Sequence, residues 1–124
     1  MNSLILKDRL QVGALVETFL ESKGIATREA YRQDLVCFES FLMNKVGIES
    51  LPVLFSLNTA ELNFVVLKYR EHLVEEKLSP ATINRRFGAI RSLFKLARLL
   101  GHSASEIEIP NLKTAAYRDT RGPG

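Results

Sequence analysis

Apolar residues recur in the first part of this chain at the three- and four-residue spacing of amphipathic helices. One segment covers about residues 7–23, and its apolar positions are Val12, Leu15, Val16 and Phe19. A second begins after Thr27 as N-cap, reaches about residue 45, and has the apolar positions Tyr31, Leu35, Phe38, Phe41 and Leu42. Gly24 and Gly47 follow these segments as helix stops. The pattern predicts two half-buried helices.

Two more helices are predicted in the second half. The third begins at Asn58 or Thr59 and reaches about residue 77, with its apolar positions at Leu62, Val65, Val66, Tyr69 and Leu73. The fourth has Ser79 as N-cap and Pro80 at its first position, a combination typical of a helix start. It ends at Gly101, and its apolar face consists of Ile83, Phe87, Ile90, Phe94 and Ala97.

The connections between the predicted helices are short, apart from residues 46–57, where Gly47 and Pro52 interrupt any long element. No strand-like alternation extends beyond a few residues. We therefore expect an all-α fold, a compact bundle of four helices with antiparallel neighbours. One domain is expected over residues 1–109. Pro110 and the closing Arg-Gly-Pro-Gly are typical of a linker, which we place at residues 110–124.

Composition adds a charge asymmetry to this picture. The 124 residues are 46% hydrophobic and 25% charged, as in an ordinary globular protein. Residues 1–79 carry nine Lys and Arg against eleven Asp and Glu, whereas residues 80–124 carry eight against three. Such an imbalance favours a polyanionic partner, although a solvated helix face gives the same count.

Catalytic and metal-binding motifs are missing from the sequence. The lone Cys37 cannot form an internal disulfide and falls within a helical apolar pattern, where a buried structural thiol is expected. His72 and His102 lie 30 positions apart without neighbouring ligands. We expect no cofactor, no metal and no small-molecule substrate. The N-terminal apolar stretch is interrupted by charges and no segment is long enough to span a membrane, so a cytoplasmic location is expected.

Basic and small residues share exposed faces on two predicted helices. Opposite the apolar side of the fourth helix lie Arg85, Gly88, Ala89, Ser92 and Lys95, with Thr82 toward one flank. Arg86 and Arg91 flank the apolar stripe and can reach solvent from its edges. The second helix begins with a similar set, Thr27, Arg28, Arg32 and Gln33. Such faces fit a DNA groove, where Arg and Lys bind phosphates and hydroxyls reach backbone or base edges.

Two stretches carry a family resemblance. They are T-x-x-x-Y-R-x-D-L-x-x-F-x-x-F-L from Thr27 to Leu42 and L-S-P-A-T-I-N-R-R-F-G-A-I-R-S-L-F-K-L-A from Leu78 to Ala97. Together they resemble the N-terminal core-binding domain of tyrosine recombinases and phage integrases, most closely the Xer type. The resemblance extends over about residues 5–113. Its most specific part is S-x-x-T-I-x-R-R-x-x-A-I-R-S-x-F in the fourth helix.

The resemblance implies a four-helix, SAM-like bundle that clamps double-stranded DNA during integration or recombination. The second and fourth helices of such domains cross the major groove. By position, the implied DNA contacts are Thr27, Arg28, Arg32, Ser79, Thr82, Arg85, Arg86, Arg91 and Lys95. The first helix in this family often contacts other recombinase protomers on the site. An exposed Leu20, or Leu4, Ile5 and Leu6, would then serve such contacts.

Family catalysis requires an Arg, a Lys, an H-x-x-R pair and a nucleophilic Tyr in a second domain. Neither His72 nor His102 is followed by Arg at the third position, and Tyr117 falls in the expected linker. We therefore assign no catalytic residue and expect no enzyme activity of the chain itself. A helical protein-interaction module with a basic face is the alternative. A helix-turn-helix regulator is less favoured, because no short helix pair with a three- to four-residue glycine turn occurs.

Overall fold

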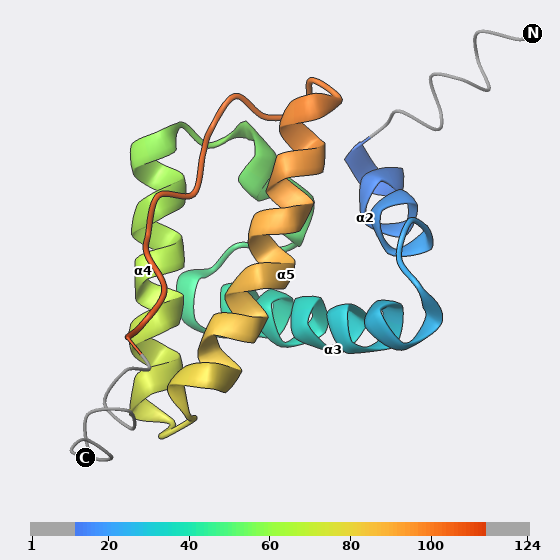
Figure 1. Ribbon diagram of the computed structural model, residues 1–124. Coiled ribbons are helices and arrows are strands. Elements are labelled where there is room, and N and C mark those ends of the chain that lie inside the picture. The colour runs from blue at the N-terminus through green and yellow to red at the C-terminus, as the bar shows by residue number, and fades with distance from the viewer. Residues whose placement is uncertain (1–11, 114–124) are drawn as a thin grey trace, which may run out of the picture.

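The computed structural model describes residues 12–113, and it confirms the all-α prediction (Figure 1). Within these residues the α-helices are α2 (Val12–Glu21), α3 (Ile25–Phe41), α4 (Thr59–Glu75) and α5 (Pro80–Leu99). A single π-helical turn, η1 (Leu42–Val46), continues α3, and a 3-10 helix, η2 (Leu51–Ser56), precedes α4. No strand occurs within residues 12–113.

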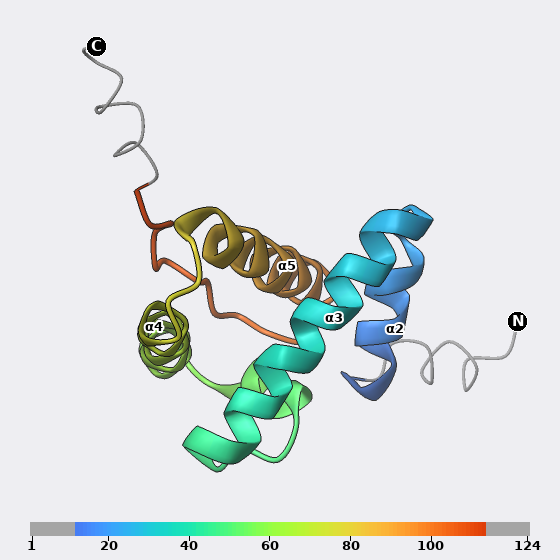
Figure 2. The same cartoon turned by 90° about the horizontal axis from the view of Figure 1, so that it is seen from below.

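Helix α5 lies at the centre of the fold and contacts α2, α3 and α4. The predicted apolar face of α5 is buried, and Leu93 is buried as well. Placing Ala89 on the exposed face was wrong, because this residue is fully buried. A helix packed by neighbours on more than one side buries more than the single stripe that periodicity identifies. Helix α3 runs across α5 (Figures 1 and 2), so the neighbours are not uniformly antiparallel.

Aromatic side chains fill the space where α3, α4 and α5 meet. The ring of Tyr69 lies 4.7 Å from that of Phe38, 5.0 Å from that of Phe41 and 6.3 Å from that of Phe87, measured between centroids. All four side chains are buried. Offset aromatic contacts of this kind add about 0.5–1.5 kcal/mol per pair beyond the area they bury. The predicted stripes of three helices therefore meet in one core.

The predicted starts of α4 and α5 are confirmed. Asn58 accepts a hydrogen bond from the Glu61 backbone N–H at 2.8 Å, while the Glu61 carboxylate accepts one from the Asn58 N–H at 3.0 Å. This reciprocal capping box satisfies two free donors of the first turn. At α5, Ser79 Oγ accepts from the Thr82 N–H at 3.2 Å, and Pro80 occupies the first turn.

The start of α3 differs from the prediction. Thr27 is not the N-cap: the helix begins at Ile25, and Gly24 in an extended conformation precedes it. The Arg28 N–H donates to the Gly24 carbonyl at 2.7 Å and closes the first turn. Helix α2 ends at Glu21, two residues earlier than predicted, so residues 22–24 form the connection to α3.

Two other features were not predicted. The 3-10 helix η2 buries Leu51, Leu54 and Phe55 in a stretch that was expected to be irregular. Leu20 is buried, so the idea of an exposed Leu20 available to a neighbouring protomer was wrong. The other residues suggested for that role, at positions 4–6, lie outside the described part of the chain.

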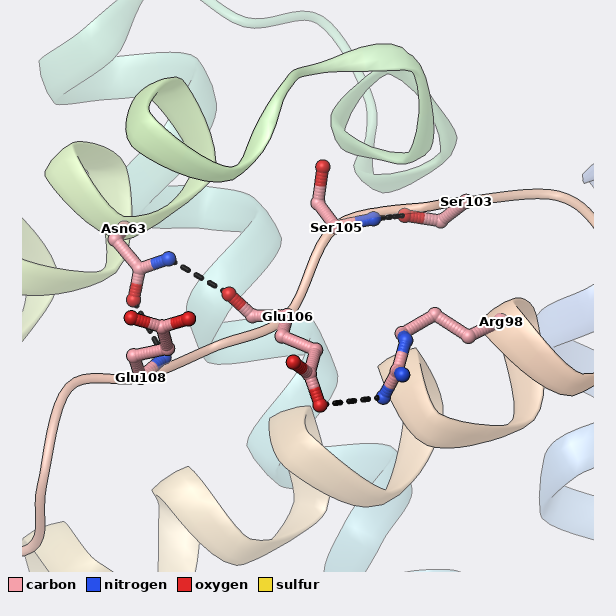
Figure 3. A network of polar contacts seen from close by, with 6 residues as sticks. All are labelled: Asn63, Arg98, Ser103, Ser105, Glu106 and Glu108. Atoms are coloured by element: carbon pink, nitrogen blue, oxygen red, sulfur yellow. Dashed lines mark hydrogen bonds and ion pairs between the residues drawn. The ribbon is translucent and has the colours of Figure 1, made fainter.

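Residues 103–113, which we call the strap, return along α4 and α5 in an extended conformation (Figure 1). Asn63 anchors the middle of the strap: its Nδ2 donates to the Glu106 carbonyl at 2.7 Å, and its Oδ1 accepts from the Glu108 N–H at 2.6 Å (Figure 3). Asn84 forms a similar pair with the backbone of Leu112, at 2.8 and 2.9 Å. Asparagine side chains thus supply hydrogen-bond partners that a neighbouring strand would ordinarily provide for extended backbone.

Apolar and charged contacts also hold the strap. Ile107, Ile109 and Leu112 pack against the core, and Arg98 pairs with Glu106 at 3.0 Å (Figure 3). Ser105 Oγ donates to the Leu57 carbonyl at 2.6 Å. Residues 110–113 therefore lie on the helices, while residues 114–124 are outside the described part. A domain boundary at residue 109 stays a prediction.

Replacing the strap anchor tests this arrangement. Asn63→Ala removes one donor and one acceptor for strap backbone groups, so we expect a loss of about 1–2 kcal/mol in the free energy of unfolding. Amide exchange of residues 106–109 should accelerate more than that of α5. Asn44→Ala is the control, because Asn44 Nδ2 donates only to the exposed Ser40 Oγ at 3.3 Å. Unchanged exchange in the strap would contradict the anchoring role.

Candidate nucleic-acid interface

The solvent side of α5 presents basic and small residues at helical spacing. Arg85, Gly88, Ser92 and Lys95 follow one another at intervals of three or four, so they lie on the same side of the helix. Arg85 and Lys95 are exposed, and Gly88 has open space where a Cβ would stand. Helix α3 crosses α5 beside this face (Figure 2).

Arg85 forms the shortest ion pair of the described residues, and the pair links α5 to α3. Its Nη1 lies 2.7 Å from Asp34 Oδ2. The Asp34 side chain is 3% exposed, whereas that of Arg85 is 49% exposed. The guanidinium therefore contacts a buried carboxylate while about half of the Arg85 side chain stays exposed.

Burial raises the pKa of Asp34 above its usual value, although the charge of Arg85 and the hydrogen bond from it pull that pKa down, as does the charge of Arg86. The effect of removing the carboxylate from water on this pKa is thus larger than the opposing effect of the two arginines. Burial of this pair is therefore not by itself a source of stability, because the desolvation cost of the carboxylate opposes its attraction to the cation.

Arg86 points to the other side of the α3–α5 crossing. Its Nε is buried and has no hydrogen-bond partner within residues 12–113, and the same holds for the Tyr69 hydroxyl. Both line a cleft of about 340 Å³, together with Cys37 and Lys45. Burial raises the pKa of Tyr69 to about 12, so this hydroxyl is protonated at neutral pH.

The predicted basic residues of α3 are engaged with α2. Arg28 Nε donates to the Leu20 carbonyl at 3.1 Å, and its Nη2 donates to the Lys23 carbonyl at 3.1 Å. These bonds satisfy free carbonyls at the carboxyl end of α2 and favour a cation there. Arg32 Nη1 lies 3.3 Å from Glu17 Oε2 on α2. Both arginines thus connect two helices.

The hydroxyl residues of the predicted set lie at helix starts. Ser79 Oγ donates to Thr82 Oγ1 at 3.0 Å, so the two hydroxyls form one group at the amino end of α5. Thr27 lies exposed in the first turn of α3. These residues stay candidates for backbone contacts.

Arg91 and Lys95 face different surroundings. Arg91 donates to the Ile109 carbonyl and to Asn111 Oδ1, and its guanidinium lies 5.4 Å above the Phe87 ring. It therefore holds the strap. Lys95 lines a groove of about 580 Å³ between the α2–α3 connection and α5.

Two basic residues of that groove were not among the predicted contacts. Lys23 and Arg98 line it with Lys95. The amine of Lys23 lies 5.0 Å from the centroid of the Phe19 ring, so it rests on the core. The position of Lys23 at the end of the first helical pattern did not predict that it lines a groove, because the groove forms only when α2 packs on α5.

Asp34 was also missed, although the sequence carried a signal. This acidic residue lies three positions after Tyr31 and next to Leu35, within the apolar stripe of α3. A charged residue there needs a partner when the helix packs. The partner, Arg85, is 51 positions away in sequence, which periodicity alone cannot identify.

The remaining titratable residues form no metal site within the described residues. His72 Nε2 lies 3.4 Å from Glu76 Oε2 at the edge of α4, as its boundary position indicated. Cys37 is partly buried rather than fully buried. Among residues 12–113, no helix is both long and apolar enough to cross a membrane.

The Asp34–Arg85 pair can be tested by a thermodynamic cycle. Arg85→Ala leaves a buried carboxylate without its partner, so we expect the free energy of unfolding at pH 7 to fall by about 1–3 kcal/mol. In an Asp34→Asn background, the same change should cost less than half as much. Urea denaturation of the four proteins measures the coupling. Additive effects of the two substitutions would contradict a coupled pair.

The stability of Asp34→Asn should depend on pH. Because the folded pKa of Asp34 is raised above 3.8, folded wild type binds this proton more tightly than the unfolded chain. The stability that wild type gains from binding this proton is therefore fully present below the pKa of Asp34 in the unfolded chain. It is lost as the pH rises through the pKa of Asp34 in the folded protein. Compared with wild type, Asp34→Asn should gain stability over this window. Thermal unfolding from pH 3 to 7 checks the sign, and a relative loss would contradict it.

Comparisons with known proteins relate the chain to tyrosine recombinases. It is 34% identical over 118 residues to a tyrosine recombinase of Synechocystis sp. PCC 6803, covering 91% of this chain and 37% of that protein. It is also 34% identical over 98 residues to a tyrosine recombinase of Synechococcus elongatus PCC 7942, covering 77% and 31%. No protein-family model and no solved structure matches the chain. The chain is thus similar to tyrosine recombinases and spans about a third of their length.

Proposed function

We propose that this chain is the N-terminal, SAM-like core-binding domain of an Xer-like, site-specific tyrosine recombinase, and that it clamps the duplex of the recombination site. The similarity to two tyrosine recombinases carries the proposal. The basic face of α5 beside α3 supports it, because the sequence resemblance assigns the DNA contacts to these two helices.

The composition of this face suits close approach to DNA. Gly88 and Ser92 are small, so α5 can enter a major groove without large side chains holding it away. Lys95 on one side of them offers positive charge, and Arg85 on the other offers a guanidinium that is half exposed beside Asp34. The proposed contact with a polyanion also explains why the region after residue 79 is basic while the rest of the chain is slightly acidic.

The nine predicted contacts divide into two groups in this proposal. Arg28, Arg32 and Arg91 already bind other parts of the chain, so they support the interface and reach phosphate only from its edges. The other six are Thr27, Ser79, Thr82, Arg85, Arg86 and Lys95. All of them face DNA in this proposal except Arg86, which lines the cleft on the other side of the α3–α5 crossing.

Catalysis belongs, in this proposal, to the part of the recombinase relatives that the chain does not cover. The chain contributes affinity and position on the recombination site, where it meets other recombinase protomers. The duplex is its partner, and no cofactor is needed for this role.

Charge reversal on α5 tests DNA binding. We expect wild type to bind a fluorescent duplex with an affinity that falls linearly with salt on a log–log plot. Lys95→Glu should reduce the affinity about 3- to 10-fold and lower the salt slope by about 1. Fluorescence anisotropy between 50 and 200 mM salt measures both quantities.

Lys68→Glu is the matched control, since it changes the net charge equally on α4, where Lys68 pairs with Glu71 at 3.7 Å. Equal losses in the two variants would mean that only net charge matters, and would contradict a face on α5. Absence of binding at low salt would favour the protein-interaction module.

A further inference from the structure

Arg85 differs from an ordinary phosphate-binding residue because its charge is compensated inside the protein. Asp34 lies 2.7 Å from Nη1, and its carboxylate is buried beneath the guanidinium. The pair together carries little net charge, so it contributes little to the long-range attraction between the domain and a polyanion. Lys95 is exposed and forms no ion pair within residues 12–113, so it is better suited to that role.

The geometry favours a different task for Arg85. A guanidinium is a planar fork of five N–H donors, and a single bond to Nη1 leaves Nε and Nη2 without partners within residues 12–113. The Arg85 side chain is half exposed at the α5 surface, so a ligand can approach it there. Two parallel donors in a fixed plane match the O6 and N7 acceptors of guanine in the major groove.

The buried partner makes that plane fixed. An exposed arginine loses considerable side-chain entropy when it is ordered on a base. Asp34 orders the guanidinium before DNA arrives, because the carboxylate is itself held between α3 and α5. A buried carboxylate that binds one guanidinium nitrogen at 2.7 Å restricts the orientation of the whole planar group.

We infer that Arg85 reads a guanine base and that Asp34 is the positioning residue that aims it. The inference rests on the proposed function and assigns sequence specificity to one pair at the α3–α5 crossing. Lys95 and the hydroxyl residues then supply affinity, while the Asp34–Arg85 pair selects the site.

Selection from a random-sequence DNA duplex pool is the first step of the test. Wild type should enrich sequences with a guanine at one position. Arg85→Lys, which keeps the charge of the pair, should lose that preference while its affinity for the unselected pool and its salt slope stay within about twofold of wild type. Asp34→Asn should also lose the preference, although the uncompensated charge of Arg85 raises its affinity for the unselected pool. A preference unchanged in Asp34→Asn would overturn the positioning role.

Atomic substitution in the enriched duplex is the second step. Replacing the preferred guanine by 7-deazaguanine removes the N7 acceptor and should weaken wild-type binding about 2- to 10-fold. The same replacement should not affect Arg85→Ala. If Arg85→Ala instead weakened binding to all sequences and lowered the salt slope by about 1, Arg85 would be a phosphate contact and the inference would be wrong.

Two further variants keep the test decisive. Arg85→Lys retains the charge without the planar fork, so it should lose the guanine preference even if Asp34→Asn folds poorly. Glu29→Gln removes an exposed charge from the same helix as Asp34 and should leave the preference intact. Binding without any enriched sequence would overturn the inference alone, whereas absence of binding would overturn the proposed function.

Discussion

The crossing of α3 over α5 is the contact on which the rest of the molecule depends. Phe38 on one side of it and Phe87 on the other both pack against Tyr69 of α4, so three helices share one aromatic centre. The same crossing buries Asp34 and brings Arg85 to it. A change in the angle between the two helices would therefore alter the core and the proposed interface together.

Local signals in the sequence were sufficient for most of the helices. Ser79 with Pro80, and Asn58 with Glu61, satisfy helix donors within a few residues, so their effect is visible without any tertiary context. The N-cap assigned to Thr27 failed for the opposite reason. Gly24, the residue before α3, has no side chain that could cap the helix. The Arg28 side chain instead donates to the Leu20 carbonyl of α2, a contact that depends on tertiary structure.

The candidate site was predictable as a set of residues but not as an arrangement. Helical spacing placed Arg85 and Lys95 on one face, and the structure agrees. Helical spacing could not predict that Arg91 binds the strap or that Arg85 binds Asp34, because those contacts join residues 20 and 51 positions apart. Ala89 failed similarly, since its burial reflects the number of helices that surround α5.

Asn84 and Arg85 are consecutive residues that face different surfaces of α5. The first holds the backbone of Leu112, and the second faces the crossing with α3. Helix α5 therefore joins the strap to the crossing through two adjacent residues. The backbone of Leu112 and the buried carboxylate of Asp34 are held by side chains one residue apart on the same helix.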